Sequence, residues 1–233
     1  MWSGDFWKLD PGEKRLLQMG GLGGILAGLV AIALFALFFV APAFPTFQVE
    51  DTLIRLGASG QDRALFILVQ ALTFLLGLLT MTLFLALYRI LREANLGYAL
   101  FGSAIGVVGS SILAVGYAIA AITGLRLADQ YAAASATEKE AVLMLALLFD
   151  GILTWGFLIP TFILFGIAFL ALGAAIRRGG PFSKTHGNLS VIFGAIVLVG
   201  IALGPFGIIA YETVPIIWFI LIGVKVYRLS GAT

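Results

Sequence analysis

The 233-residue sequence contains no cysteine and only one histidine, and charged residues make up just 11% of it. Without cysteine, neither a disulfide bond nor a thiolate-ligated metal site can form. The low charge and the mean hydropathy of +1.09 exclude an ordinary soluble globular domain. A formal net charge of +2 is too small to argue for nucleic-acid binding. These absences favour a protein that is embedded in a lipid bilayer.

The sequence also lacks the short motifs that carry common chemistry. It has no HExxH, no GxSxG, no P-loop and no aspartate-rich pair suited to a magnesium-diphosphate site. The stretch "GGPFSKT" (179–185) lacks the P-loop spacing. The histidine, His186, falls in the same polar connector, where a solvated loop residue is expected rather than an axial haem ligand. We therefore expect no catalytic residues, no bound metal and no cofactor.

Long apolar windows dominate what is present, and they predict an all-α, polytopic membrane bundle formed by a single domain over residues 1–233. The first four windows each suit one spanning helix of about 20 residues. The last window is too long for one span and contains the break Gly204-Pro205-Phe206-Gly207, which predicts two helices rather than one long kinked helix. The six predicted spans cover about 18–42, 64–88, 97–125, 151–176, 188–203 and 207–229.

Charged residues in the connectors support this count. With six spans, one side of the membrane holds ten basic and four acidic residues, a formal charge of +6. The other side, with the adjoining helix halves, holds four basic and eight acidic residues, a formal charge of −4. The excess of Lys and Arg predicts that both termini lie in the cytoplasm. Five spans would place Lys225 and Arg228 on the wrong side.

The N-terminal segment 1–10 is expected to lie in the headgroup region, since it carries Trp2, Phe6 and Trp7. The motif "DPGE" (10–13) predicts a helix start, with Asp10 as the cap, Pro11 in the first position and Glu13 in the third. The polar lead of about 19 residues is too long for a cleaved signal peptide.

Small residues recur at helical spacing within the spans. The first span carries Gly20, Gly24 and Gly28, and the third carries Gly102, Gly106 and Gly109. Such faces allow another helix to approach closely, so they predict helix packing. A sharper interpretation, in which these faces line a narrow cavity, also fits the spacing.

Two connectors carry further signals. The stretch "VEDTLIRLGA" (49–58) is typical of a short amphipathic helix on the outer surface. The connector 126–149 begins polar, offers Thr137 as a helix cap, and then becomes apolar. The fourth span could therefore begin with an extra helical segment outside the bilayer core.

Five polar residues are predicted to lie in the outer half of the bundle: Glu212, Gln70, Tyr117, Asp150 and Thr154. Ionisable groups inside a membrane are costly and suggest function. If these side chains converge, they form a polar pocket that opens outward. Alternatively, Asp150 lies in the headgroup zone and Glu212 serves only to hydrogen-bond a neighbouring helix.

The last span, "YETVPIIWFILIGVKV" (211–226), resembles the final helix of a prokaryotic membrane family of unknown function, domain of unknown function 4386. Glu212, Trp218, Gly223 and Lys225 fit the pattern of that helix. The stretch "LYRILREANLGYAL" (87–100) is similar to the family's connection between the second and third spans. "FGIAFLALGAAIRRGG" (165–180) and "GNLSVIFG" (187–194) resemble the passage from the fourth span to the fifth.

The resemblance covers about residues 20–228. It departs from the family where a Leu-Pro pair often precedes the fifth helix, because this sequence has "PFSKTHGN" (181–188) instead. The resemblance implies six helices and singles out Glu212, but it implies no activity.

Two functional hypotheses follow. The first is a non-catalytic integral membrane protein that contacts other membrane subunits, or itself, as an accessory or assembly subunit of a larger complex. The second is a small carrier or receptor for a solute or proton at the Glu212 pocket. Either would be a multi-pass protein of the prokaryotic plasma (inner) membrane whose immediate surroundings are the lipid bilayer.

Overall fold

The computed structural model describes residues 10–40, 53, 60–203 and 208–231. Among these residues the secondary structure is helical and contains no strand. Side chains of residues 38–40, 60–61 and 208–212 lie outside the described part. The helices are α1 (Pro11–Val40), α3 (Gly60–Leu91), α4 (Leu96–Ala133), α5 (Ala136–Ile152), α6 (Ile159–Arg178), α7 (Lys184–Ala202) and α8 (Ile208–Gly231), with a π-helix, η2 (Leu153–Leu158), between α5 and α6.

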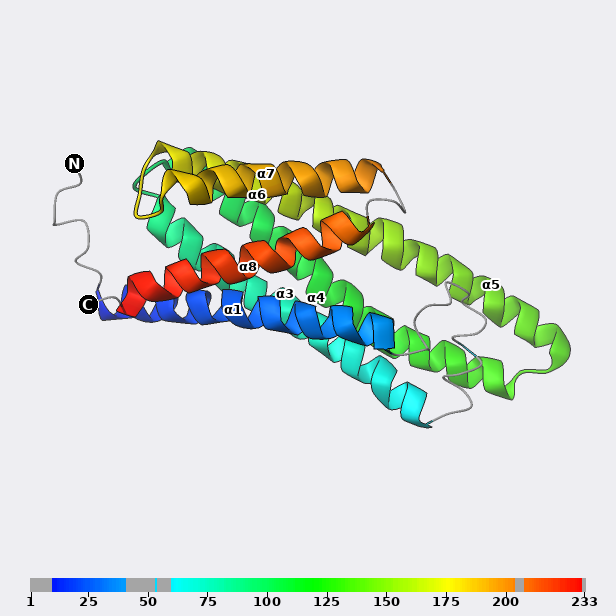
Figure 1. The fold of residues 1–233 in the computed structure, drawn as a ribbon. Helices are drawn as coiled ribbons and strands as arrows, with labels where there is room; N and C mark the ends of the chain where they lie inside the picture. The colour runs from blue at the N-terminus through cyan, green and yellow to red at the C-terminus, as the bar shows by residue number, and fades with distance from the viewer. Residues whose placement is uncertain (1–9, 41–52, 54–59, 204–207, 232–233) are drawn as a thin grey trace.

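Six spans in the described part are long and apolar enough to cross a membrane, as predicted from the sequence. They form a closed ring in which α1 contacts α3, α3 contacts α4, α4 contacts α6, α6 contacts α7, α7 contacts α8, and α8 returns to α1. The first and last spans are therefore neighbours, although they lie at opposite ends of the sequence (Figure 1). The Gly204–Gly207 break itself lies outside the described residues.

The fourth span is the longest element, because α5, η2 and α6 form one continuous helix over Ala136–Arg178. Pro160 lies near the start of α6 and has no N–H, and its ring would clash with the carbonyl of Gly156 in a regular α-helix. The π-helical turn just before it relieves this conflict, since the N–H of Ile159 donates to the carbonyl of Thr154 instead.

Side-chain caps determine where several helices begin. The predicted start at Asp10 is confirmed: the N–H of Glu13 donates to Asp10 Oδ1 (2.8 Å), and the N–H of Asp10 donates to Glu13 Oε2 (3.3 Å). The expectation that Thr137 caps α5 is wrong, because the helix begins at Ala136 and Thr137 lies inside its first turn. Its cap is Ser135, whose N–H donates to Glu138 Oε2 (2.8 Å).

Aromatic side chains fill the centre of the ring. Trp218 of α8 stacks on Phe169 of α6, with ring centroids 4.1 Å apart, and also on Phe84 of α3 at 5.9 Å. Phe165 and Phe219 pack edge to face against each other at 5.7 Å. This cluster joins α3, α6 and α8, so the middle of the described bundle is a packed core.

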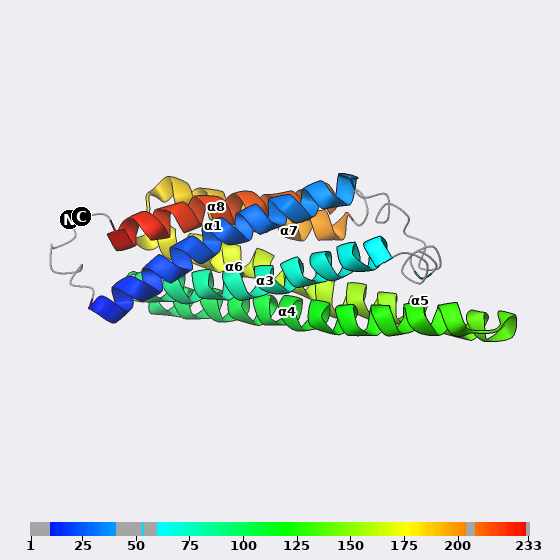
Figure 2. The same cartoon turned by 90° about the horizontal axis from the view of Figure 1, so that it is seen from below.

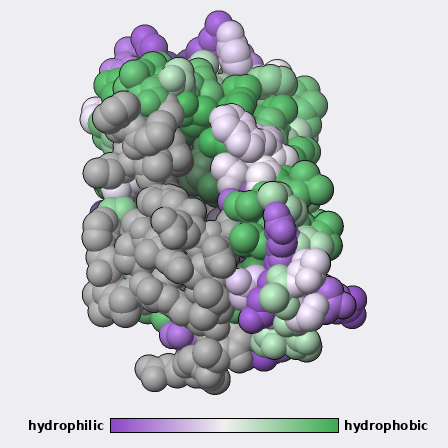
Figure 3. Space-filling view, turned by 90° about the vertical axis from the view of Figure 1, so that its right-hand side faces the viewer, coloured by the Kyte–Doolittle hydropathy of each residue, from purple (hydrophilic) through white to green (hydrophobic). Residues whose placement is uncertain are grey.

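The two ends of the bundle differ in shape. One end of the bundle contains the start of α1, the end of α8 and the short α3–α4 and α6–α7 connections (Figure 1). This is the basic end, for which the sequence predicts a cytoplasmic location. At the other, outer end, α5 and the end of α4 extend side by side beyond the remaining helices (Figures 1 and 2). Seen from that end, hydrophilic residues lie toward the lower right and along the top edge, with hydrophobic surface between them (Figure 3).

Candidate functional site

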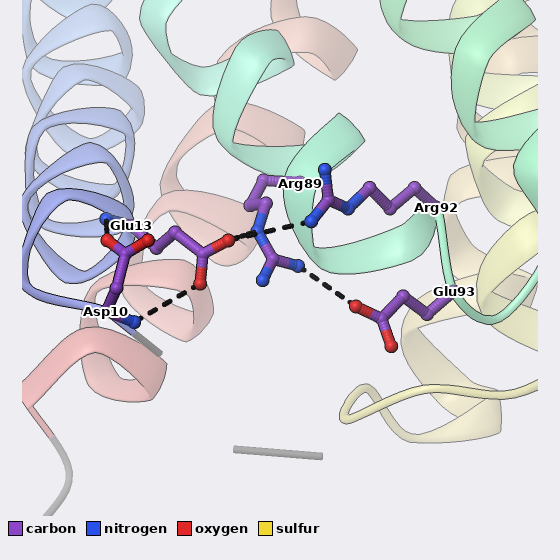
Figure 4. Close-up of polar contacts among 5 residues, drawn as sticks. All are labelled: Asp10, Glu13, Arg89, Arg92 and Glu93. Atoms are coloured by element: carbon purple, nitrogen blue, oxygen red, sulfur yellow. Dashed lines mark hydrogen bonds and ion pairs between the residues drawn. The ribbon is translucent and has the colours of Figure 1, made fainter. Parts of the chain in front are cut away.

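A network of charged side chains ties three segments together at the basic end (Figure 4). Arg89, near the end of α3, forms an ion pair with Glu13 of α1 and another with Glu93, whose Oε1 lies 3.4 Å from Arg89 Nη1. Arg92 Nη2 lies 3.5 Å from Glu13 Oε1. The Arg89 side chain is only 15% exposed, so the network fixes the start of α1 against the α3–α4 connection.

Polar groups inside the bundle are used mainly in contacts between helices. Thr80 of α3 lies 2.8 Å, Oγ1 to Oγ, from Ser110 of α4, and the Ser110 hydroxyl donates to the carbonyl of Gly106 (2.8 Å). The hydroxyl of Thr161 in α6 donates to the carbonyl of Gly109 in α4 (3.4 Å). These bonds satisfy polar groups that would be costly in an apolar interior.

The indole of Trp218 likewise forms a hydrogen bond with a hydroxyl group of a neighbouring helix. Its Nε1–H donates to Ser190 Oγ of α7 (2.8 Å), and the Ser190 hydroxyl donates to the carbonyl of His186 (2.9 Å). The histidine thus lies in the first turn of α7, half-buried, and not in the solvated loop that the sequence suggested. Trp218 is 1% exposed, so this chain of two hydrogen bonds lies inside the ring.

The glycines of the first span lie against α3 and α8. A Cβ added to Gly20 would clash with Ala86 of α3, and one added to Gly28 would clash with Ile220 of α8. A Cβ on Gly24 would lie 2.9 Å from the Cα of Gly223. The stripe therefore lies at crossings within the chain.

The glycines of the third span divide between two neighbours. A Cβ on Gly106 would clash with the ring of Phe84 in α3. One on Gly102 would lie 2.8 Å from Leu172 of α6, and one on Gly109 would lie 3.2 Å from Leu164 of the same helix. Packed side chains occupy the space beside these glycines.

The predicted polar pocket is only partly described. Gln70 of α3 is buried, and its Oε1 has no hydrogen-bond partner among the described residues. Tyr117 of α4 and Thr154 of η2 are half-buried, whereas Asp150, near the end of α5, is exposed. No contact of Asp150 or Thr154 with Gln70 is seen among the described residues, and their convergence on one pocket stays a prediction.

Glu212 lies in the first turns of α8, but its side chain is outside the described residues. A pocket formed by Glu212, Gln70 and Tyr117 therefore stays a prediction. The same holds for the amphipathic helix expected over 49–58, of which the structure describes only Leu53, a buried residue. Nowhere in the described ranges do three or more His, Asp or Glu side chains form a group that could hold a metal ion.

The outer end has an ion pair of its own. Arg63, near the start of α3, donates through two nitrogens to Asp129 near the end of α4, at 2.7 and 3.2 Å. The side chain of Asp129 is 60% exposed and that of Arg63 is 34% exposed. This pair links the last turns of α4 to the start of α3.

Comparison with known proteins gives one match. The model of the family described as "Domain of unknown function (DUF4386)" matches residues 21–227. The chain belongs to this family. No curated protein and no solved structure matches the chain. Membership of the DUF4386 family extends over all six spans and assigns no activity.

The structure gives physical roles to two residues of the DUF4386-like pattern in the last helix. Trp218 is the centre of the aromatic core, and Gly223 lies where the backbones of α1 and α8 approach each other closely, since its Cβ would lie 2.7 Å from the nitrogen of Ile25. Lys225 is half-buried toward the basic end. The pattern therefore includes residues that hold α8 in the ring.

Sequence reasoning missed three features of the site. It used Glu13 for the start of the first helix and counted Glu13 and Arg89 toward the topology, but did not pair them, although a carboxylate and a guanidinium at matching depths in two adjacent spans could have suggested the pair. It did not pair Ser190 with Trp218, because nothing in the sequence places α7 beside α8 in that register. It also missed η2, for which Pro160 four residues after Gly156 was the available signal.

Proposed function

We propose that this protein is a non-catalytic integral membrane protein that acts through helix–helix contacts, as an accessory or assembly subunit of a larger membrane complex. The observation that carries the proposal is the interior of the ring. Its aromatic core, its glycine crossings and its interhelical hydroxyl bonds connect the described spans into a packed body. A packed interior leaves the outward-facing surface as the part that can bind a partner.

The proposal includes a location in the plasma (inner) membrane of a prokaryote, with both termini in the cytoplasm. It is supported by the positive-inside distribution and by the ion-pair network at the basic end. Because the chain has no cysteine, single cysteines can report the orientation. Ser183→Cys at the basic end should be protected from a membrane-impermeant maleimide in intact cells, whereas Ala133→Cys should react. The opposite pattern would reverse the orientation.

The functional test is purification of the tagged full-length chain from native membranes in a mild detergent. We expect it to migrate in native electrophoresis together with other membrane proteins, at a mass above that of the 24.7-kDa chain and its detergent. Gly223→Leu should abolish this co-migration by disrupting the ring, while Gly231→Leu, at an open position, should preserve it. A protein that purifies without other subunits from its native membrane would contradict the proposal.

A second candidate, a small carrier or receptor for a solute or proton, is supported by one observation. Gln70 is 9% exposed, and its Oε1 lacks a partner among the described residues, so a polar atom is available inside the outer half of the bundle. The test is uptake of protons or labelled small solutes by proteoliposomes that contain this chain alone. Uptake that Glu212→Gln or Gln70→Leu abolishes, with the thermal stability unchanged, would favour the carrier over the accessory subunit.

A further inference from the structure

The basic end of the bundle carries an uneven distribution of charge. The acidic side chains described there belong to α1 or to the connection after α3: Asp10, Glu13 and Glu93. Asp10 caps α1, and both Glu13 and Glu93 form ion pairs with Arg89. The remaining side, formed by α6, α7 and α8, contributes only basic side chains to this end among the described residues. Its positive charge therefore needs a counter-ion from another source.

Four basic side chains gather around the first turn of α7, and we call them the α7 basic cluster: Arg177, Lys184, His186 and Lys225. Arg177 of α6 lies beside α7, since a Cβ added to Gly187 would lie 2.7 Å from Arg177 Cγ. Lys225 of α8 is close enough for its charge to act on the His186 imidazole. Within the described ranges, no carboxylate forms an ion pair with any member of the cluster.

The first turn of α7 has the wrong charge for the start of a helix. Unpaired N–H groups and the positive end of the helix dipole favour acidic residues at that position. The first turns of α1 and α5 follow this rule with Glu13 and Glu138. The first turn of α7 contains Lys184 and His186 and no acidic residue. An anion bound here would therefore stabilise the start of α7.

The depth of the α7 basic cluster matches that of phospholipid headgroups. The 19 residues of α7 correspond to about 28 Å along its axis, so its first turn lies near one boundary of the ~30-Å hydrocarbon core. Deeper in the membrane, α7 and α8 present exposed apolar side chains, Ile192 at 51% and Leu221 at 41%. Leu221 lies one turn from Lys225, on the same face of α8. A phosphate at the cluster thus has apolar surface next to it for acyl chains.

We propose that the α7 basic cluster binds the phosphate group of an anionic phospholipid, whose acyl chains lie along α7 and α8. A zwitterionic lipid brings its own cation and leaves the positive charge of the cluster uncompensated, whereas an anionic lipid neutralises part of it. A free phosphate ion matches the charge but not the apolar surface. This inference goes beyond the proposed function, because the isolated chain can bind a lipid without any partner subunit.

The side chains of the cluster offer complementary hydrogen-bond donors to a phosphate. The His186 Nδ1 atom lies 2.7 Å from Ser183 Oγ. When the Ser183 hydroxyl donates to Nδ1, the imidazole proton is on Nε2, and that N–H can donate to a phosphate oxygen. The guanidinium of Arg177 can bind two phosphate oxygens at once, while Lys184 and Lys225 act as point charges.

Native mass spectrometry tests the proposal on the full-length chain, which is delipidated in a non-ionic detergent and titrated with lipid. The chain should bind phosphatidylglycerol at least about fivefold more tightly than phosphatidylcholine. Arg177→Gln, Lys184→Gln and Lys225→Gln should each weaken phosphatidylglycerol binding about fivefold, the factor expected for one surface cation. Lys225→Arg should retain it. Lys14→Gln is the matched control, because Lys14 is an exposed cation of α1 at the same end, and it should leave binding unchanged.

Three results would overturn the proposal. Equal affinity for the two lipids would show that the cluster does not select an anionic headgroup. An equal loss of affinity in Lys14→Gln and Lys225→Gln would indicate a general attraction of the basic end. Displacement of phosphatidylglycerol by an equal concentration of inorganic phosphate, or of a tetraglutamate peptide, would assign the cluster to a free phosphate or to an acidic protein segment instead.

Thermal unfolding separates lipid binding from a structural role of the same residues. In lipid-free detergent, Lys225→Gln should melt no lower than the natural chain, because it removes an unpaired cation near the start of α7. Phosphatidylglycerol should raise the melting temperature of the natural chain more than that of Lys225→Gln. Lys184→Gln, at an exposed position, repeats both measurements. An equal rise in the natural chain and in both variants would overturn the proposal.

Discussion

The α1–α8 crossing and the outer helix α5 are both made of apolar sequence, yet they have opposite surroundings. At the crossing, Gly24 and Gly223 allow two backbones to meet, so that any added side-chain atom would clash. In α5, Leu145 and Leu148 face away from the bundle. In a membrane protein, hydrophobicity alone therefore does not indicate which faces pack together. Small residues at helical spacing indicate which faces pack together.

The largest loss of stability is expected in the aromatic core, and two single substitutions of tryptophan by alanine test this expectation. Trp218→Ala should lower the free energy of unfolding by about 3–5 kcal/mol, because it removes the centre of the aromatic core and leaves a cavity. Trp155→Ala is the control, since Trp155 is 74% exposed and has little to lose. Reversible unfolding in mixed detergent micelles measures both. A Trp155→Ala loss as large as that of Trp218→Ala would show that the outer helix belongs to the core.

The second prediction concerns the glycine crossing itself. Gly223→Ala should destabilise the protein by about 1–3 kcal/mol, because the new Cβ would meet backbone atoms of α1 that cannot move independently. Gly231→Ala, in the same helix but with nothing within 4 Å, should be neutral or slightly stabilising. Thermal unfolding of the two variants in the same detergent gives the melting temperatures to be compared. Equal melting temperatures would contradict the close crossing.

The third prediction concerns the hydrogen bond between the Trp218 indole and Ser190. Ser190→Ala should cost about 1–2 kcal/mol, because the indole N–H of Trp218 loses its acceptor while remaining buried. Adding Trp218→Phe to Ser190→Ala removes the unpaired donor, so the two changes should not be additive. A double-mutant cycle of unfolding free energies measures this coupling. Strict additivity would mean that the hydrogen bond does not form in the membrane.

Several features of the fold could be predicted from the sequence because they depend on local chemistry. Span length, the cap at Asp10 and the break before α8 each follow from a few consecutive residues. The ring order, the Trp218–Ser190 bond and the contact of Gly24 with Gly223 depend on how separate helices are placed, which no local pattern specifies. The resemblance to the DUF4386 family pointed to Trp218 and Gly223, but only the structure gives them their roles.

The candidate site was harder to predict for the same reason. Depth along a span could be estimated by counting residues, and this count placed Asp150 and Thr154 near the outer surface. The direction of a side chain around its helix depends on the neighbouring helices, so the exposure of Asp150 and the burial of Gln70 could not be separated. Glu13 and Arg89 were likewise assigned to the correct end without being paired.

The smallest effect is expected at the outer end, where Arg63 of α3 and Asp129 near the end of α4 form an ion pair. Asp129→Asn should leave the melting temperature unchanged, because water and salt screen exposed pairs. The matched change at the basic end, Arg89→Gln, should lower it, because the Arg89 side chain is 15% exposed and would leave Glu13 without its closest cation. The effect of Asp129→Asn should instead be local. Hydrogen exchange should quicken in α4 beyond Gly124 and stay unchanged around Gly106, which packs against Phe84. If Asp129→Asn lowers the melting temperature as much as Arg89→Gln, the end of α4 is an integral part of the folded bundle, and the contrast between the two regions does not hold.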